Sequence, residues 1–362
     1  MASETIDGRR VVFTRDEILE SGDFAEPLIA SGVRCHGGFD AGGVYGSPRM
    51  RHRGPAIGAW QARLTREGGA LLDVSPGLMP PQYPNVEQSK LLLCEGVRDP
   101  IVRRLTIISI VEGFGAIIRD VEVPDLRAAF REPVDGTALA HLQGALFEAH
   151  ARDESGYRDQ GGHKQMWEAA RDLAFENPRI PGDVLMRMMG RRGRGGKRTR
   201  AFPQIDEKLE QMLATMLQVL VVEVFAMGTF AWGEQLLADP EVSAAPEEAS
   251  RMVEHIRRDE SPHVEYLRTA LSEARARTVA TVDGGEISGR RVVDGLLHRA
   301  LCSMTRERRE AQRADVRQDL VEAMKAARRP QSLLERFDAL DTAWTPPVAT
   351  GFEPPAGETP SR

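Results

Sequence analysis

Apolar residues return every three or four positions in six long segments after residue 86. These segments cover roughly residues 100–120, 136–155, 163–176, 205–238, 246–276 and 289–328. That period is typical of the buried face of an α-helix. Stretches containing proline, such as E-V-P-D and N-P-R-I-P-G, separate the segments and indicate turns. The pattern therefore predicts an all-α core with additional helices.

The first 86 residues have a different pattern. They hold 13 of the 34 glycines, and pieces such as R-R-V-V-F-T and A-W-Q-A-R-L alternate apolar and polar residues. This region is predicted to be a glycine-rich extension that is loop-rich or partly β. The expected division of the chain is 1–86 for this extension, 87–276 for the helical bundle, 277–343 for helices packed on it, and 344–362 for a disordered, proline-rich tail.

Residues Met212 to Trp232 form an apolar run long enough to cross a membrane. Glu223 lies near its middle, where an acidic side chain costs about 2.5–3.5 kcal/mol on insertion scales. The chain has no second run of this quality, and its first ten residues lack the apolar stretch of a signal peptide. We interpret the run as a helix buried inside a bundle and expect a cytoplasmic protein without membrane contact.

The overall composition argues against a chain built mainly to coat nucleic acid. A formal charge of -6, with 41% hydrophobic and 28% charged residues, is ordinary for a globular protein. The three cysteines are far apart and form no C-x-x-C pair, which excludes a disulfide framework, a rubredoxin-type iron centre and a zinc knuckle. One basic stretch, Arg191 to Arg200, could bind phosphates or RNA, but it lacks aromatic residues, so a solvated surface loop is favoured.

Comparison of the chain with itself indicates where chemistry could occur. I-V-E-G-F around Glu112 recurs as V-V-E-V-F around Glu223, and R-D-E-S-G at Arg152–Gly156 recurs as R-D-E-S-P at Arg258–Pro262. The order of a single Glu followed by an Asp-Glu pair therefore occurs twice. Buried carboxylates are too costly to keep without partners, so four such glutamates most naturally meet at a cation.

The second copy continues to D-E-S-P-H, which places Glu260 and His263 three residues apart on one helix face. In the first copy Tyr157 takes the histidine position, and His163 follows only after Y-R-D-Q-G-G. Without these six residues the first copy reads D-E-S-G-H-K-Q-M-W and aligns with the second. In an unbroken helix His163 would lie about 13 Å along the axis from Glu154, so the glycines must let the insertion loop out.

These residues resemble the ferritin-like superfamily of non-haem di-iron carboxylate proteins, in its oxygenase or oxidase-type branch with D-E-x-x-H repeats. The resemblance covers roughly residues 100–270 and implies a four-helix bundle in which two helices each give one Glu and two give Glu-x-x-His. The metal ligands that it implies are Glu112, Glu154, His163, Glu223, Glu260 and His263. Oxygen-rich ligands of this kind suit two iron ions, or Fe/Mn or Mn/Mn pairs, better than zinc.

The same resemblance assigns supporting roles to Asp153 and Asp259, which would orient metal-bound histidines. Tyr157 is a tentative catalytic residue, because it could bind the metal or act as a redox-active phenol if His163 does not complete the first half of the site. Supporting or surface roles are favoured over metal ligation for the remaining polar residues near the pairs. These are His141, Glu148, His150, Glu254 and His255; His36 beside Cys35 is interpreted as incidental.

The function expected from the resemblance is an oxygen-dependent oxidoreductase with O₂ as co-substrate, a small organic substrate and an external electron donor. Storage ferritins are shorter chains, and peroxide-reducing rubrerythrins carry rubredoxin cysteines that this sequence lacks. The regions flanking the bundle could enclose a substrate or build a homodimer interface, and a homodimer is expected. The alternatives are a non-catalytic or metal-storage ferritin-like protein with a degenerate first half-site, and, less favoured, an RNA-acting protein that uses the basic loop.

Overall fold

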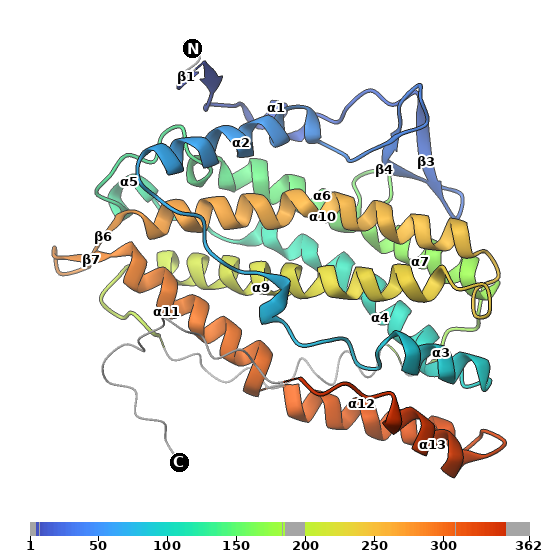
Figure 1. The fold of residues 1–362 in the computed structure, drawn as a ribbon. Coiled ribbons are helices and arrows are strands. Elements are labelled where there is room, and N and C mark those ends of the chain that lie inside the picture. Colours follow the sequence, from blue (N-terminus) through green and yellow to red (C-terminus); the bar gives the residue numbers. More distant parts are fainter. Residues whose placement is uncertain (1–4, 7, 183, 185–199, 308, 345–362) are drawn as a thin grey trace, which may run out of the picture.

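The computed structural model describes residues 5–6, 8–182, 184, 200–307 and 309–344. The described chain is mostly helical, with a small sheet near its N-terminus, as Figure 1 shows. Five helices run side by side through the middle of the molecule. They are α4 (Asp99–Gly115), α6 (Phe147–Ser155), α7 (His163–Phe175), α9 (Glu207–Leu237) and α10 (Pro246–Arg275).

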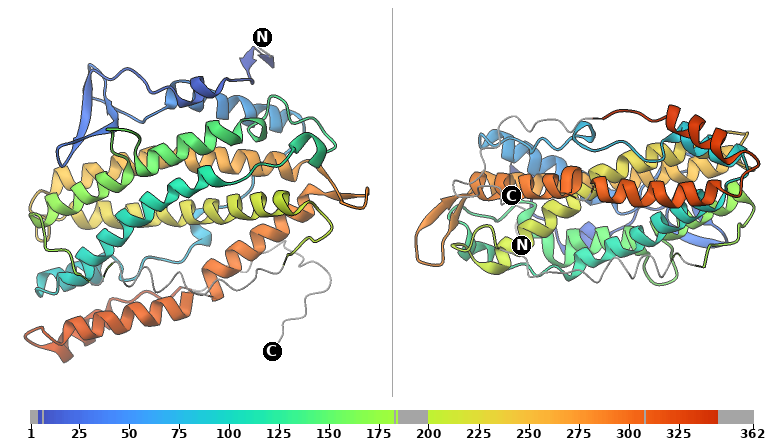
Figure 2. Two further views of the ribbon diagram at one scale, coloured as in Figure 1. Left: turned by 180° about the vertical axis from the view of Figure 1, so that it is seen from behind. Right: turned by 90° about the horizontal axis from the view of Figure 1, so that it is seen from below.

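These five helices do not all contact one another. α10 packs along α9 and α7, and α4 packs along α7 and α6, as the view from behind in Figure 2 shows. In contrast, α4 and α9 have little direct contact. Among the five helices, α9 packs mainly on α10, and the helices surround a shared interior.

The N-terminal region is partly β, as the sequence predicted, but it also contains a helix that was not expected. The region begins with β1 (Thr5–Ile6), β2 (Arg9–Arg10) and α1 (Arg15–Leu19), and β3 (Glu26–Ala30), β4 (Val33–Phe39) and β5 (Tyr45–Gly46) then form an antiparallel sheet in the order β3-β4-β5. The A-W-Q-A-R-L piece, interpreted as alternating, belongs to α2 (Met50–Arg66). Gly54, Pro55 and Gly58 obscure the helical pattern, although Ile57, Trp60 and Leu64 follow a helical spacing and are buried.

The predicted helix over residues 136–155 is shorter in the structure. Only Phe147–Ser155 is regular α-helix, after a short 3₁₀ turn at Leu139–His141 and a wide turn at Leu142–Leu146. Gly144 has φ 70°, a left-handed conformation that interrupts an α-helix. The segments α3 (Val86–Cys94) and α5 (Leu126–Ala129) flank α4 along the chain.

The C-terminal region also departs from its predicted single helix over residues 289–328. After a hairpin of β6 (Thr278–Ala280) and β7 (Glu286–Ser288), the chain forms α11 (Gly289–Cys302), a wider helical turn at Ser303–Glu307, and then α12 (Arg309–Met324) and α13 (Pro330–Ala339). α11 packs on α9 and α10, and α12 packs on α4 (Figure 2). Residues 191–199 of the basic stretch and residues 345–362 of the predicted disordered tail lie outside the described residues.

One helix of the described chain, α9, is long and apolar enough to span a membrane. Half of its most apolar window is buried, and it packs against α10 and α11. A helix in the core of a globular protein passes the same test. The arrangement agrees with the interpretation of Met212 to Trp232 as a buried helix.

Two apolar clusters fill the interior, one toward each end of the long helices. The first takes residues 209–224 of α9 and residues 266–274 of α10, and Trp60 of α2 joins it. The second takes residues 230–237 of α9 and residues 249–256 of α10, together with Tyr45 from the sheet. A set of buried carboxylates and histidines lies between the two clusters, and the N-terminal region contributes to both sides of it.

Candidate metal centre

Five helices bring the six predicted ligands to one place. Glu112 lies in the last turn of α4, Glu154 in the last turn of α6, and His163 is the first residue of α7, while Glu223 lies within α9, and Glu260 and His263 lie within α10. All six side chains are buried. They form two groups whose ligand atoms lie within 4.8 Å of one another, and either group could hold a metal ion.

The first group consists of Glu112, Glu154, His163 and Glu260. Nδ1 of His163 lies 2.7 Å from Oε1 of Glu260, 3.3 Å from Oε1 of Glu154 and 3.7 Å from Oε2 of Glu112. Three carboxylates thus converge on one imidazole nitrogen. This donor set is suited to a hard divalent cation.

The second group consists of His150, Glu154, Glu223 and His263. Nδ1 of His263 lies 3.1 Å from Glu154 Oε1 and 2.7 Å from Glu260 Oε2. Nε2 of His150 lies 3.4 Å from Glu223 Oε1, and its ring stacks on that of His263 with centroids 3.9 Å apart. Because Glu154 belongs to both groups and Glu260 contacts both predicted histidine ligands, the groups adjoin through shared carboxylates.

The six-residue insertion loops out of the helical path between α6 and α7. Tyr157 and Gln160 pair across a tight turn, and the amide of Gly161 donates to the carbonyl of Arg34 in β4. Gly156 has φ 83°, and a Cβ on Gly162 would lie 2.3 Å from the carbonyl oxygen of Asp153. The ends of the insertion therefore meet closely, which only glycine permits, and α7 begins at His163 beside Glu154.

Each histidine turns its other ring nitrogen toward an aspartate of the opposite copy. Nε2 of His263 hydrogen-bonds with Oδ2 of Asp153 at 2.9 Å, and Nε2 of His163 lies 3.8 Å from Oδ2 of Asp259. An aspartate in this position fixes the ring so that Nδ1 faces the glutamates. Asp153 thus makes the hydrogen bond that its predicted role calls for, whereas Asp259 faces the ring of His163 from beyond hydrogen-bond distance.

The N-terminal region holds these aspartates in place. Nη1 of Arg53 donates to Asp153 Oδ2 at 2.7 Å, and Nε of Arg49 donates to Asp153 Oδ1 at 2.9 Å. Tyr45 donates its hydroxyl proton to Asp259 Oδ2 at 2.6 Å. Residues more than 100 positions upstream therefore complete the surroundings of both histidines.

The charges of the cluster are strongly coupled. Burial, together with the neighbouring Glu154 and Glu260, raises the pKa of Glu112 well above its ordinary value, and burial with Glu260 does the same for Glu223. Burial alone would lower the pKa of His263, but Glu260 and Asp153 outweigh it, so that the pKa is raised. Burial and the neighbouring carboxylates thus favour the protonated forms of Glu112 and Glu223.

The cluster satisfies a chemical test for bound metal. Several buried ligand atoms face their neighbours without a hydrogen bond: Glu112 Oε2, His150 Nε2, Glu154 Oε1, His163 Nδ1 and Glu260 Oε1. Unsatisfied buried polar atoms are rare because each costs about 1–3 kcal/mol. The four glutamates when ionised would carry the charge that two divalent cations neutralise. The residues therefore fit a pair of metal ions.

Tyr157 is not brought into either group. Its ring lies against the guanidinium of Arg152, 3.7 Å from the ring centroid, and its backbone belongs to the inserted turn. His163 takes the place beside Glu154 that Tyr157 would occupy in an unbroken helix. The structure therefore gives Tyr157 no contact with the carboxylate cluster.

The other polar residues lie as follows. Glu148 pairs with Arg152, and His141 accepts a hydrogen bond from the amide of Phe13. His255 stacks on Tyr45 with centroids 4.0 Å apart, which supports the tyrosine that holds Asp259. His36 belongs to neither group, and its Nδ1 lies 3.3 Å from Nη1 of Arg49.

Sequence reasoning missed four residues of this centre. His150 was expected to have a supporting or surface role, although it lies four residues before Glu154 and so shares its helix face. That spacing was the available signal. Arg49, Arg53 and Tyr45 gave no comparable signal, because their role depends on how the extension folds back on α6 and α10.

Comparisons with known proteins add no name to this arrangement. No family model matches the chain, and neither the curated proteins nor the solved structures give a significant match. The class of protein therefore has to be argued from the helical fold and the buried cluster alone.

Proposed function

We propose that this protein is an oxygen-dependent, non-haem di-iron oxidoreductase with a ferritin-like four-helix bundle. In this proposal α4, α6 continued by α7, α9 and α10 are the four members of the bundle. The observation that carries the proposal is the meeting of four buried glutamates and three histidines in two adjoining groups. The two copies of the sequence repeat contribute in the same manner, as a bundle built from two similar halves requires.

The proposed ligands divide between two ions. Glu112, Glu154, His163 and Glu260 would hold one, and His150, Glu154, Glu223 and His263 the other. When bound, a pair of redox-active iron ions supplies the electrons that reduce dioxygen, and an external donor restores them. Two manganese ions or a mixed pair would fit the same donors.

The chain's own residues would orient the metal ligands and exclude water from the centre. Asp153 holds the ring of His263 by a hydrogen bond, and Asp259 faces the ring of His163. The arginines at positions 49 and 53 keep Asp153 ionised by lowering its pKa against the effect of burial. The two apolar clusters exclude water from both ends of the centre. Glu112 and Glu223 are the least deeply buried of the six predicted ligands, with 8% of each residue exposed.

The test is oxygen uptake by protein loaded anaerobically with ferrous iron. We expect rapid oxygen consumption that scales with bound iron, stops once that iron is oxidised, and resumes on reduction. Glu260→Ala should abolish it, whereas Glu265→Ala, a half-buried residue of the same helix outside both groups, should leave it intact. Iron that accumulates beyond two ions per chain would instead indicate storage, and bound iron inert to oxygen would overturn the proposal.

A further inference from the structure

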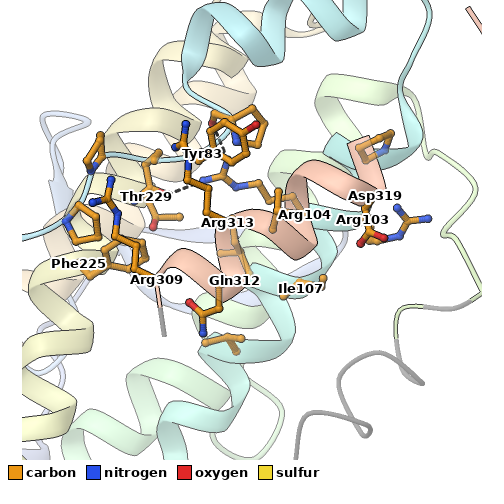
Figure 3. Close-up of a pocket in the computed structure, with 18 of the residues that line it drawn as sticks. Tyr83, Arg103, Arg104, Ile107, Phe225, Thr229, Arg309, Gln312, Arg313 and Asp319 are labelled. Atoms are coloured by element: carbon orange, nitrogen blue, oxygen red, sulfur yellow. Dashed lines mark hydrogen bonds between the residues drawn. The ribbon is translucent and has the colours of Figure 1, made fainter. Parts of the chain in front are cut away.

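A cavity of about 470 Å³ lies where α4 and α9 separate. α12 closes one side of it, and the proline-rich segment 80–84 closes another. Figure 3 shows four arginines around it, Arg103 and Arg104 from α4 and Arg309 and Arg313 from α12. Arg313 is paired with Asp341, and Asp319 is the one acidic residue of the lining, so the wall carries a net positive charge.

Arg104 is the most informative of these residues. Its two hydrogen bonds go to neutral acceptors, the side-chain oxygen of Gln82 and the carbonyl oxygen of Pro84, and its guanidinium lies 3.8 Å from the ring centroid of Trp232. No carboxylate of the described residues pairs with it. Burial lowers the pKa of Arg104 to about 9. A partly buried cation without a counter-ion is costly, and an anion bound in the cavity would offset that cost.

The rest of the wall is largely apolar, and part of it comes from residues close in the chain to two of the predicted ligands. Ile108, Val111 and Phe225 line the cavity. Val111 directly precedes Glu112, and Phe225 lies two residues after Glu223. The wall of the cavity therefore includes residues that lie next to two of the predicted ligands along the chain, although both glutamates are themselves buried.

A second cavity, of about 860 Å³, adjoins the first through Val222, Met304 and Gln312. Its charges are balanced in a different way, because Arg200 is paired with Glu210 at 2.9 Å. Arg104, which no carboxylate of the described residues pairs with, belongs to the lining of the first cavity.

We propose that the cavity between α4, α9 and α12 binds an amphipathic organic anion. Its carboxylate or phosphate group pairs with Arg104, and its apolar part lies against Ile108, Val111 and Phe225, toward Glu112 and Glu223. The evidence for this binding is the lining of the cavity. That the bound anion is the substrate rests on the proposed function.

Binding can be measured on metal-free protein with sodium decanoate and decyl phosphate as probes, by calorimetry and by the fluorescence of Trp232. Decanol and decyltrimethylammonium are the matched neutral and cationic probes, and acetate lacks the apolar part. We expect at least one anionic probe to bind and the three controls to bind at least about tenfold more weakly. Equal binding of decanol, or no binding of either anion, would overturn the inference.

Two variants locate the site. Arg104→Gln should weaken binding of the anion at least about tenfold. Arg317→Gln removes a cation of α12 that pairs with Asp338 outside the cavity, and it should leave binding unchanged. Val111→Trp fills the cavity from a position that is 43% exposed, so it should fold and also block binding. Unchanged binding in Arg104→Gln and Val111→Trp would place the anion elsewhere and overturn the inference.

The proposed anion site and the proposed metal centre can be tested independently of each other. Loss of anion binding leaves metal loading and oxygen uptake untouched, and protein that binds no metal can still bind decanoate. With both intact, the bound anion should change the rate of oxygen uptake by the iron-loaded protein. Binding without any such change would contradict the role of this cavity as the substrate site.

Discussion

The two copies of the Asp-Glu repeat reach similar positions by different routes. In the second copy, α10 runs unbroken through D-E-S-P-H, with Pro262 inside the helix. In the first, α6 ends at Ser155, six residues loop out, and α7 begins at His163. Two arginines hold Asp153 of the first copy, and one tyrosine hydroxyl holds Asp259 of the second. Similar ligand positions therefore depend on unequal supports, and the two halves should respond differently to substitution.

The largest effect is expected at Arg53, the fully buried partner of Asp153. Arg53→Met would leave Asp153 with less compensating charge, and removal of one member of a buried ion pair costs about 3–5 kcal/mol. We expect the free energy of unfolding of the metal-free protein, measured in urea, to fall by about 3 kcal/mol, since Arg49 remains. Arg51→Met on the same helix removes a surface pair with Glu20 and should cost less than about 1 kcal/mol. Equal losses in the two variants would contradict the importance of the buried pair.

The next effect is expected at Gly115, beside the first copy. A Cβ at this position would lie 2.6 Å from Cγ of Glu154, so Gly115→Ala should displace the carboxylate that both groups share. Overpacking of this size costs about 1–3 kcal/mol, and we expect metal affinity to fall about tenfold or more at both sites.

Gly113→Ala is the control for that change. Gly113 lies on the same helix as Gly115, and its Cβ would meet only the flexible side chain of Lys164, at 3.0 Å. Metal titration of the two variants should separate them, and equal affinities would show that Glu154 is not held where the structure has it.

A smaller effect is expected at Tyr45, the support of the second copy. Tyr45→Phe removes one hydrogen bond to Asp259, and loss of such an outer partner lowers metal affinity about 10- to 100-fold. We expect the lower end of that range, since His255 still stacks on the ring. Tyr83→Phe, in which the ring contacts Phe337 instead, should leave metal affinity unchanged. An unaltered affinity in Tyr45→Phe would indicate that Asp259 does not orient His163.

The smallest effect is expected at Tyr157. Because its ring contacts Arg152 and not the cluster, Tyr157→Phe should change stability by less than about 0.5 kcal/mol and leave metal content and oxygen uptake unchanged. Loss of oxygen uptake with normal metal content would restore a catalytic role to this residue.

The sequence predicted much of the centre because its residues repeat. Buried glutamates within apolar helices, and Glu260 with His263 at a helical spacing, are local patterns that carry their own physical reason. The mostly helical core and the partly β extension followed from periodicity and glycine content in the same way. The looping out of the insertion could be expected because alignment of the two copies exposes it.

Other features depend on tertiary contacts and left no such trace. α2 forms around Trp60 and Arg53, whose partners lie far along the chain, and its own glycines and proline argue against a helix. The break at Gly144 and the wider turn after Cys302 arise inside runs with helical periodicity. The arginine-lined cavity joins α4 and α12, which are about 200 residues apart, so no local pattern could reveal it.

We propose that His163, which follows the looped-out insertion, completes the metal site formed with Glu112, Glu154 and Glu260. The most direct measurement is metal content per chain after anaerobic loading with ferrous iron, compared between the wild-type protein, His163→Ala and Tyr157→Phe. We expect two iron ions per chain in the wild type and in Tyr157→Phe, and one iron ion per chain in His163→Ala. A wild type that holds one ion or none, or two ions that persist in His163→Ala, would contradict it.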